Sequence, residues 1–332
     1  MAQEATPAVS TVPASYQMTG MQHIPQNWNN CGPATLTMGL TYFGVAADQN
    51  PAASWLKPTS EDGNVSPWQM VEYVNTQLPG TTRAITRVGG DLTLLKTLVA
   101  NEFPVIIEAG YDPEPERLGW MGHYLLVTGF DDSKQIFNTH DSYKGANTAY
   151  SYQHVDEFWE HFNNTYIVLY KFEREQEIMT LLGTNADVTQ NALNTLEINR
   201  QRALANANDP YAWFNMGSSY VLLADYDPQA YEYAATAFDQ ARKIGLPWRM
   251  LWYQFGPYEA YFNVGRFDDV LALVEANLNN GGQYVEETYY WQGQAYTETG
   301  SIDDAVRAFN QALIQNPRYA AAQEALAALG TD

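Results

Sequence analysis

The chain has 332 residues, which is more than a single hydrophobic core normally serves, so we expect two domains. Hydrophobic residues make up 45% of the sequence and charged residues 17%, a composition typical of a globular protein and not of a disordered one. The formal net charge of −21 at pH 7 disfavours nucleic acid as a partner, because phosphates would be repelled. No apolar run approaches the roughly 20 residues of a membrane span, which excludes an integral membrane segment within the sequence.

Residues 1–15 are rich in Ala, Thr, Pro and Ser and contain no apolar core of a secretion signal, so we expect a flexible N-terminal segment. This composition is typical of a linker left after a signal has been removed. We therefore expect an extracytoplasmic or secreted protein, in which a single free thiol would be unusual unless it reacts. A cytoplasmic protein is the alternative.

The only cysteine, Cys31, follows the polar pair Asn29 and Asn30 and precedes a predicted helix that ends at Gly44. Pro33 suits the first turn of that helix, which places Cys31 at or next to its N-cap. Unpaired N–H groups and the positive end of the helix dipole stabilise a thiolate there. Cys31 is therefore a candidate nucleophile, with a buried structural cysteine as the alternative.

Helices are predicted over 66–77, where Ser66 is the N-cap, and over 91–100, where Asp91 is the N-cap. Apolar runs that follow predict strands over 103–109, 123–130, 135–139 and 166–172. Helices followed by a largely antiparallel sheet indicate an α+β domain. The loop 111–121, which precedes the strand at 123, either lines a substrate cleft or is a plain connection.

His123 begins an apolar strand, and a short turn leads to a second strand with Asp141 at its end. This hairpin can bring Asp141 beside His123. Cys31, His123 and Asp141 would then supply a nucleophile, a base and the acceptor that orients the base. Gln26 lies five positions before Cys31 and offers an amide that can join the Cys31 backbone N–H in an oxyanion hole.

The other histidines form no spacing typical of metal ligands, so we expect neither a metal nor a cofactor. His140 neighbours Asp141 on a strand and should point to the opposite face, on the surface or behind the site. His154 and His161 are interpreted as ordinary positions of a short helical segment. The fourth, His23, shares this lack of a ligand pattern.

At these residues the chain resembles the papain-like cysteine peptidases, and more closely the bacterial C39-like peptidase family. The stretch 26–44 is similar to the family's Gln…Cys-Gly-Pro block and the helix after it. Residues 103–107 resemble the strand before the histidine, and 122–131 resemble the histidine block itself. Asp141 falls where the family carries its aspartate, often within Asp-Pro, but Ser142 follows it here.

The resemblance implies an α+β papain-like cysteine peptidase domain over 16–172. It also implies that Cys31 is the nucleophile, His123 the base, Asp141 the orienting residue and Gln26 the oxyanion contributor. The substrate would be a peptide or protein. Classical members of the family cleave leader peptides after a double glycine and are fused to membrane transporters, so a stand-alone variant is implied here.

Residues 173–207 form a connecting segment with a predicted helix from 188 to 206. Beyond it the sequence repeats with a period near 35 residues, marked by Pro210, Pro247 and Pro317. The spacing of aromatic and small residues resembles tetratricopeptide (TPR) helix pairs and implies an all-α solenoid. We expect repeats at 208–246, 247–282 and 283–317, followed by a capping helix within a domain that runs to 332.

Tetratricopeptide arrays typically present a concave groove to peptides or partner proteins, so we expect this solenoid to recruit a substrate or a partner. Tyr289, Tyr290 and Trp291 cannot all face inward on one helix, so one of them is a candidate groove residue. The sequence thus predicts a thiol-dependent peptidase. A catalytically inactive binding protein and an acyl transferase using the same residues are the alternatives.

Overall fold

The computed structural model describes residues 12–61, 63–78, 80, 82–112 and 119–330. Most of the predicted flexible segment, residues 1–11, therefore lies outside the described residues, as do 113–118 of the loop before His123. Ser15, placed by prediction at the end of the flexible segment, instead begins the first strand.

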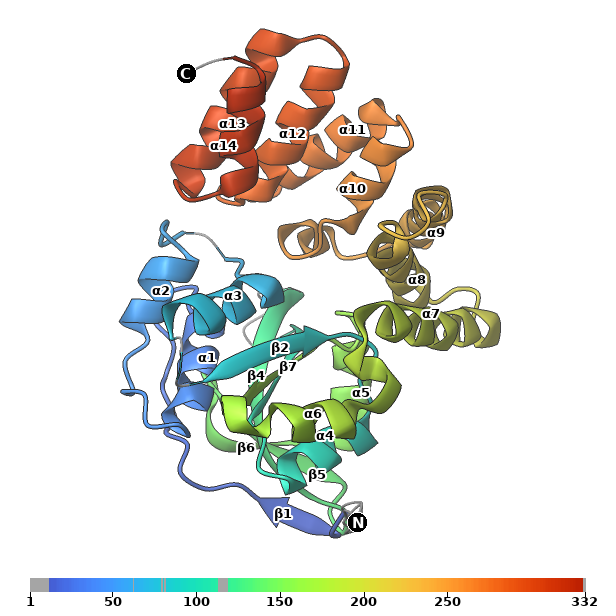
Figure 1. Cartoon of the computed structure of the whole chain (residues 1–332). Helices are drawn as coiled ribbons and strands as arrows, with labels where there is room; N and C mark the ends of the chain where they lie inside the picture. The colour runs from blue at the N-terminus through green and yellow to red at the C-terminus, as the bar shows by residue number, and fades with distance from the viewer. Residues whose placement is uncertain (1–11, 62, 79, 81, 113–118, 331–332) are drawn as a thin grey trace, which may run out of the picture.

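A seven-stranded antiparallel sheet forms the centre of the N-terminal part, with the strand order β2-β7-β3-β4-β5-β6 and β1 paired to β4 (Figure 1). The α+β class and the antiparallel sheet were predicted and are confirmed. The strands are β1 Ser15–Gln17, β2 Arg83–Arg87, β3 Val105–Tyr111, β4 Met121–Asp131, β5 Ile136–Asp141, β6 Gly145–Ser151 and β7 Tyr166–Tyr170.

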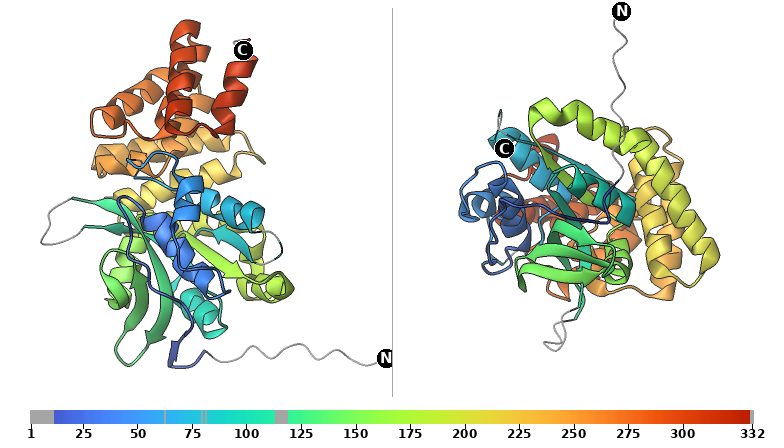
Figure 2. Two further views of the ribbon diagram at one scale, coloured as in Figure 1. Left: turned by 90° about the vertical axis from the view of Figure 1, so that its left-hand side faces the viewer. Right: turned by 90° about the horizontal axis from the view of Figure 1, so that it is seen from below.

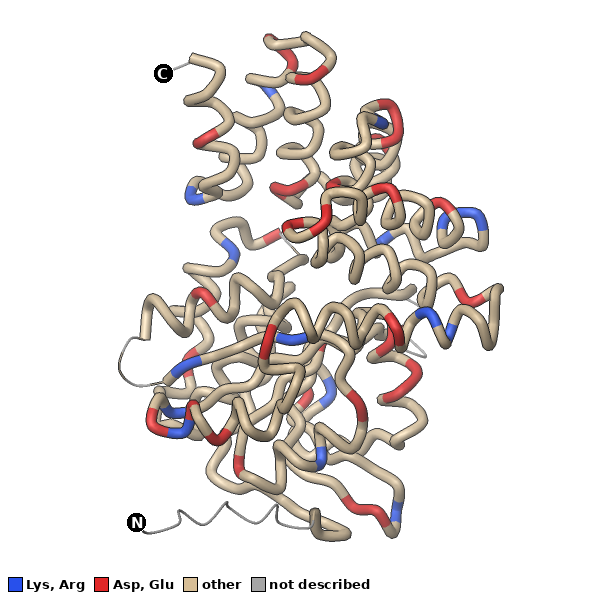
Figure 3. Tube along the Cα trace, turned by 45° about the vertical axis from the view of Figure 1, so that its right-hand side comes forward, with Lys and Arg blue, Asp and Glu red and all other residues tan. Residues whose placement is uncertain are grey.

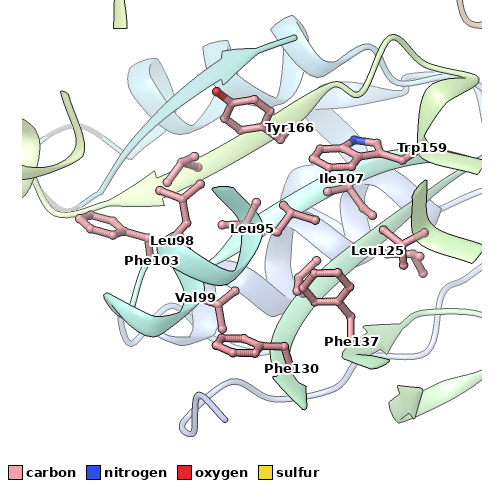
Figure 4. Close-up of a cluster of buried hydrophobic side chains, with 14 of the residues drawn as sticks. Leu95, Leu98, Val99, Phe103, Ile107, Leu125, Phe130, Phe137, Trp159 and Tyr166 are labelled. Atoms are coloured by element: carbon pink, nitrogen blue, oxygen red, sulfur yellow. The ribbon is translucent and has the colours of Figure 1, made fainter. Parts of the chain in front are cut away.

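Helices cover both faces of the sheet. On one face the core includes side chains of α1 Cys31–Thr41, α2 Asn50–Leu56 and α3 Pro67–Gln77. On the other it includes side chains of α4 Leu92–Ala100, α5 Tyr152–Glu160 and α6 Glu175–Leu182, drawn in part in Figure 4. Alternate residues of β4 enter the two cores, Tyr124 and Leu126 the first and Leu125 and Val127 the second. The sheet is therefore buried on both sides, and His123 lies near the start of β4.

Sequence patterns located the central strands and missed β1, β2 and β6. The missed strands are short or polar: β6, for example, has the sequence GANTAYS and only one buried residue, Tyr150. A strand at the edge of a sheet does not need the alternating apolar pattern on which the prediction relied.

The C-terminal part is helical, as predicted, whereas its assignment to tetratricopeptide repeats stays a prediction. Its α-helices are α7 Val188–Ala205, α8 Pro210–Leu223, α9 Ala230–Ile244, α10 Gly256–Asn263, α11 Phe267–Leu278, α12 Glu286–Glu298, α13 Ile302–Gln315 and α14 Ala320–Ala328. Short 3₁₀ helices lie at η1 Phe172–Arg174, η2 Gly183–Ala186 and η3 Trp248–Trp252.

The middle helix pair departs from a regular repeat. Where its first helix would begin, the chain forms the 3₁₀ turn η3, and α10 starts only at Gly256 with Pro257 in its first turn. Proline lacks an N–H and clashes with the preceding turn, so a helix restarts there more readily than it continues. The segment before Pro257, which includes η3, is therefore not part of a continuous helix with α10.

The helical part contacts the sheet domain at both of its ends (Figures 1 and 2). Near its start, Asn199 of α7 donates to the side chain of Asn163 at 2.7 Å, and Asn215 of α8 donates to the Glu160 carbonyl at 2.7 Å. Near its end, the Thr59 hydroxyl donates to the Gln315 carbonyl at 2.8 Å. Arg318 also donates to the carbonyl of Trp55 and lies 5.6 Å from the centre of its ring. The helices therefore form an arc fixed to the sheet domain at two places.

Acidic side chains outnumber basic ones, 38 to 17, and they are spread over both parts of the molecule (Figure 3). In the part of the chain that the structure describes, none of the helices combines the length and the apolar character needed to span a bilayer.

Candidate active site

Cys31 is the first residue of α1, with Asn30 at the N-cap, and its side chain is half-buried and free of any disulfide. The loop before it is held by Gln49, whose amide contacts the Pro25 carbonyl at 2.8 Å and whose oxygen accepts from the Asn30 side chain and the Asn27 N–H, each at 3.0 Å. This side chain fixes the loop so that the thiol is presented at the start of the helix, where N–H groups face it.

The start of α1 packs closely on the strand that carries the histidine. Thr35 donates to the Tyr124 carbonyl at 3.3 Å. A Cβ on Gly32 would lie 3.1 Å from Val65, so Val65 would have to move, and 3.5 Å from the Tyr124 ring, an ordinary contact distance. The glycine after Cys31 therefore lets the start of α1 lie close to Val65.

His123 and Asp141 lie on neighbouring strands, β4 and β5, in which Leu125 is the register partner of Asp141. The Nε2 atom of His123 is 2.8 Å from Oδ1 of Asp141, and both side chains are buried. Because Nε2 is held by the carboxylate, Nδ1 is the ring nitrogen left for the Cys31 thiol, whose side-chain interaction with His123 contributes to the charge state of the ring. The structure thus brings the three predicted residues together.

The partners of His123 decide its charge. Burial alone would lower the pKa of His123, but the hydrogen bond to Asp141 and the interactions with Cys31 outweigh it and raise that pKa to about 9. The imidazolium form is therefore favoured at neutral pH, beside an ionised Asp141. Such a ring can stabilise a thiolate and can later donate a proton.

Asp141 is fixed by a dense set of donors. Oδ1 accepts from the backbone N–H of Tyr143 at 2.8 Å and of Lys144 at 3.1 Å, and the Tyr150 hydroxyl donates to Oδ2 at 2.5 Å. Burial would raise the pKa of Asp141, but the bonds from His123, Tyr150 and Tyr143 hold it well below its usual range. Tyr150 lies on β6, a strand that was not predicted, so its role escaped the sequence analysis.

Gln26 is positioned by Ser142, the residue after Asp141. The Ser142 hydroxyl donates to the Gln26 side-chain oxygen at 2.8 Å, and the Gln26 N–H donates to the Ser142 carbonyl at 2.9 Å. Because the amide oxygen is used, the amide nitrogen is the end available for a developing oxyanion. Gln26 and Cys31 line the same cleft.

The remaining histidines lie outside this cleft. His140 is buried, which excludes the expected surface position but not the expected position behind the site, and its ring meets that of His23 edge-on at 5.9 Å between ring centres. His23 itself bonds to the Asp141 carbonyl at 2.9 Å. His154 is on α5 between the rings of Tyr150 and Phe158. Among the described residues, no three His, Cys, Asp or Glu side chains gather as metal ligands would.

The cleft around Cys31 and His123 encloses about 570 Å³, within the range typical of ligand sites. Tyr111 and Met121 line it; they are the last residue of β3 and the first of β4, on either side of the loop before the histidine. Unexpectedly, Arg249, Trp252 and Tyr253 of the helical part also line it. Nothing in the sequence pattern marked these three residues, because their contact with the sheet domain spans more than a hundred positions.

The comparisons with known proteins concern the N-terminal half. Residues 9–171 match the Peptidase_C39 like family. The chain is also similar to a protein of Bacillus anthracis whose crystal structure is described as that of a C39-like peptidase: the identity is 16%, the TM-score is 0.38, and the match covers 47% of this chain and 98% of that one. No curated protein matches the chain. The family match spans every strand of the sheet and confirms that this part of the chain resembles the C39-like peptidases, a family of the cysteine-peptidase type.

Proposed function

We propose that the protein is a thiol-dependent peptidase that hydrolyses a peptide or amide bond through a Cys31 acyl-enzyme. The observation that supports this best is the chain of contacts at the cleft. A half-buried thiol at a helix N-terminus interacts with His123, and the ring is bound on its other side by an ionised, buried Asp141. This is the arrangement that an activated cysteine nucleophile requires.

In the proposed reaction the Cys31 thiolate attacks the substrate carbonyl carbon. The negative charge that develops on the oxygen is met by the amide of Gln26 and the backbone N–H of Cys31. His123 then donates its proton to the leaving amine as the C–N bond breaks, which leaves a thioester. A water molecule gives a proton to His123 and attacks the thioester, the C–S bond breaks, and the acid product leaves with the thiolate and imidazolium restored.

Two other functions use the same geometry. If an amine replaces water in the second step, the protein is an acyl transferase. If the thioester never forms, the cleft is only a binding site. The helical part, proposed to consist of tetratricopeptide repeats, would recruit the substrate or a partner protein, and we keep the extracytoplasmic location as a proposal. Buried donors around Asp141 favour the catalytic readings, because a binding cleft has no need of an ionised carboxylate held behind a histidine.

The test is hydrolysis of a quenched-fluorescent peptide library by the parent protein and by Cys31→Ala and His123→Ala. We expect each substitution to lower kcat/KM by at least about 1,000-fold while circular dichroism shows an unchanged fold. Mass spectrometry of the products separates hydrolysis from transfer to an added amine. Peptide cleavage by the Cys31→Ala protein would contradict the proposed mechanism.

A further inference from the structure

The segment between α9 and α10, residues 248–253, leaves the helical arc and enters the cleft; we call it the wall segment. Its residues Arg249, Trp252 and Tyr253 line the same space as Cys31 and His123. The Arg249 guanidinium also donates to the carbonyl of Trp120 in the sheet domain at 3.4 Å. The helical part therefore supplies one side of the cleft.

Tyr253 packs on the residue that precedes the histidine. A side chain on Gly122 would put its Cβ 3.1 Å from the Tyr253 ring and 2.8 Å from Phe162. The Tyr253 ring also meets Trp120 and Phe162 edge-on, at 6.0 and 5.8 Å between ring centres. The glycine of the Gly-His pair thus leaves room for a ring from the other domain, and Tyr253 has a fixed place beside His123.

Trp252 is held from two sides. Cβ atoms built on Gly63 of the sheet domain and Gly281 of the helical part would lie 3.5 and 3.1 Å from its ring. Trp248 meets it edge-on at 5.6 Å between ring centres, and the Arg249 guanidinium lies 5.2 Å from its centre. A ring with neighbours on so many sides is preorganised, so it gives contact area to a ligand at little entropic cost.

Six of the described lining residues of the cleft are Trp or Tyr. Besides the catalytic pair, the ionisable side chains among the described lining residues are tyrosines and the oppositely charged Glu61 and Arg249. Aromatic rings come from both domains, and a ligand between them would lose most of its contact with water. The aromatic lining residues are Trp28, Tyr111, Tyr143, Trp252, Tyr253 and Tyr284.

We infer that the wall segment selects the substrate, by holding a bulky apolar side chain of an extended peptide against Trp252 and Tyr253 next to the bond that Cys31 attacks. This inference rests on the proposed function, because it assigns a peptide to the cleft. Selection by the wall segment differs from recruitment of a substrate on a groove of the helical part, because Trp252 and Tyr253 line the same cleft as Cys31.

The test measures binding without turnover. Fluorescein-labelled peptides Ala-Ala-X-Ala-Ala, with X as Phe, Leu, Gly or Asp, are titrated by fluorescence polarisation into the Cys31→Ala protein. We expect Phe and Leu peptides to bind at least about tenfold more tightly than the Gly and Asp peptides, the size of effect that an apolar pocket gives. Adding Trp252→Ala should abolish most of that preference.

The matched control is Tyr226→Ala, also in the Cys31→Ala protein, because Tyr226 is an aromatic residue of the helical part that is 71% exposed and outside the cleft lining. It should keep the full preference. If Trp252→Ala does not fold, Trp252→Leu retains an apolar filling and should still reduce the preference at least about threefold.

An unchanged preference in the Trp252 variants, an absent preference in the Cys31→Ala protein, or no binding of any peptide overturns the inference. Hydrolysis of the same peptides by the intact protein is recorded in parallel. Selective binding without hydrolysis would contradict the proposed peptidase activity but would still support substrate selection by the wall segment. Hydrolysis without selectivity would contradict substrate selection by the wall segment alone.

Discussion

Two histidines, His123 in the cleft and His161 where the sheet domain meets the helices, differ in what surrounds their rings. His123 is bound by the Asp141 carboxylate at 2.8 Å, and its pKa is raised to about 9 although burial acts in the opposite direction. His161 accepts from the indole N–H of Trp120 at 3.0 Å and stacks on Tyr211 at 3.8 Å. Burial lowers its pKa to about 4.

The comparison shows that removal from water does not by itself prepare a histidine for proton transfer. Without a carboxylate, enclosure keeps the ring neutral, as at His161; with one, the same enclosure leaves it charged and oriented, as at His123. His161 is suited to joining the two parts of the molecule, and Gln254 of the helical part donates to its carbonyl at 3.0 Å. The carboxylate is therefore the feature that separates the reactive region from the structural one.

Removing that carboxylate should have the largest effect. In Asp141→Ala, His123 would be enclosed without a partner, as His161 is, and we expect kcat/KM to fall by about 1,000-fold or more. Asp141→Asn should lose less, because the amide oxygen still accepts the Nε2 proton. Asp132→Ala is the control, since Asp132 binds Lys96 and Tyr152 instead of the site. Equal activity of Asp141→Ala and the control would contradict the comparison.

A smaller effect is expected from the oxyanion side of the cleft. Gln26→Ala removes the amide that Ser142 positions and should lower kcat by about 100-fold, with little change in KM, because the donor acts mainly on the developing charge. Gln201→Ala, on the exposed face of α7, removes an amide far from the cleft and should leave both constants unchanged. A rise in KM at constant kcat would instead assign Gln26 to ground-state binding.

The smallest effect concerns stability, and it should have opposite pH dependence at the two histidines. The raised pKa of His123 contributes stability that is complete below pH about 6.5 and is lost as the pH rises through 9. The lowered pKa of His161 contributes stability that is complete above pH about 6.5 and is lost as the pH falls toward 4. Urea unfolding of the parent, His123→Gln and His161→Gln from pH 5 to 9 measures both slopes.

The predicted outcome is that the free-energy difference between the parent and His123→Gln shrinks with rising pH, by on the order of 2 kcal/mol, whereas the difference for His161→Gln shrinks with falling pH. If the free-energy differences for His123→Gln and His161→Gln changed with pH in the same direction, the Asp141 carboxylate would not be the feature that distinguishes the two histidines.

Much of the site was predictable because it depends on local signals. The Cys31 motif precedes a helix with strong start and stop residues, and His123 and Asp141 lie on a hairpin, so that short-range geometry brings them together. The observed helix runs from Cys31 to Thr41, three residues short of Gly44. The central strands were found for the same reason: their apolar runs are continuous, because the sheet is buried on both faces.

The features that were missed depend on contacts distant in the chain. Tyr150 donates to Asp141 from a polar edge strand, and Gln49 fixes the loop before Cys31 through bonds that no local pattern records. The wall segment was assigned to the middle repeat, and only the packing of the two domains shows Trp252 at the cleft. In the run 289–291, of which one residue was a candidate for the groove, Tyr290 lies 5.6 Å from Tyr319 and Trp291 5.7 Å from Phe262 between ring centres, and the groove itself stays a prediction.

The most direct test of the central claim, that His123 activates Cys31, is the rate of iodoacetamide alkylation at pH 6.5 in the parent and in His123→Ala. The chain has one cysteine, so a single thiol reports. We predict that the parent reacts at least about tenfold faster, because the imidazolium stabilises the reactive thiolate at this pH. Equal rates in two folded proteins would contradict an activated pair and favour a cleft that binds without catalysis.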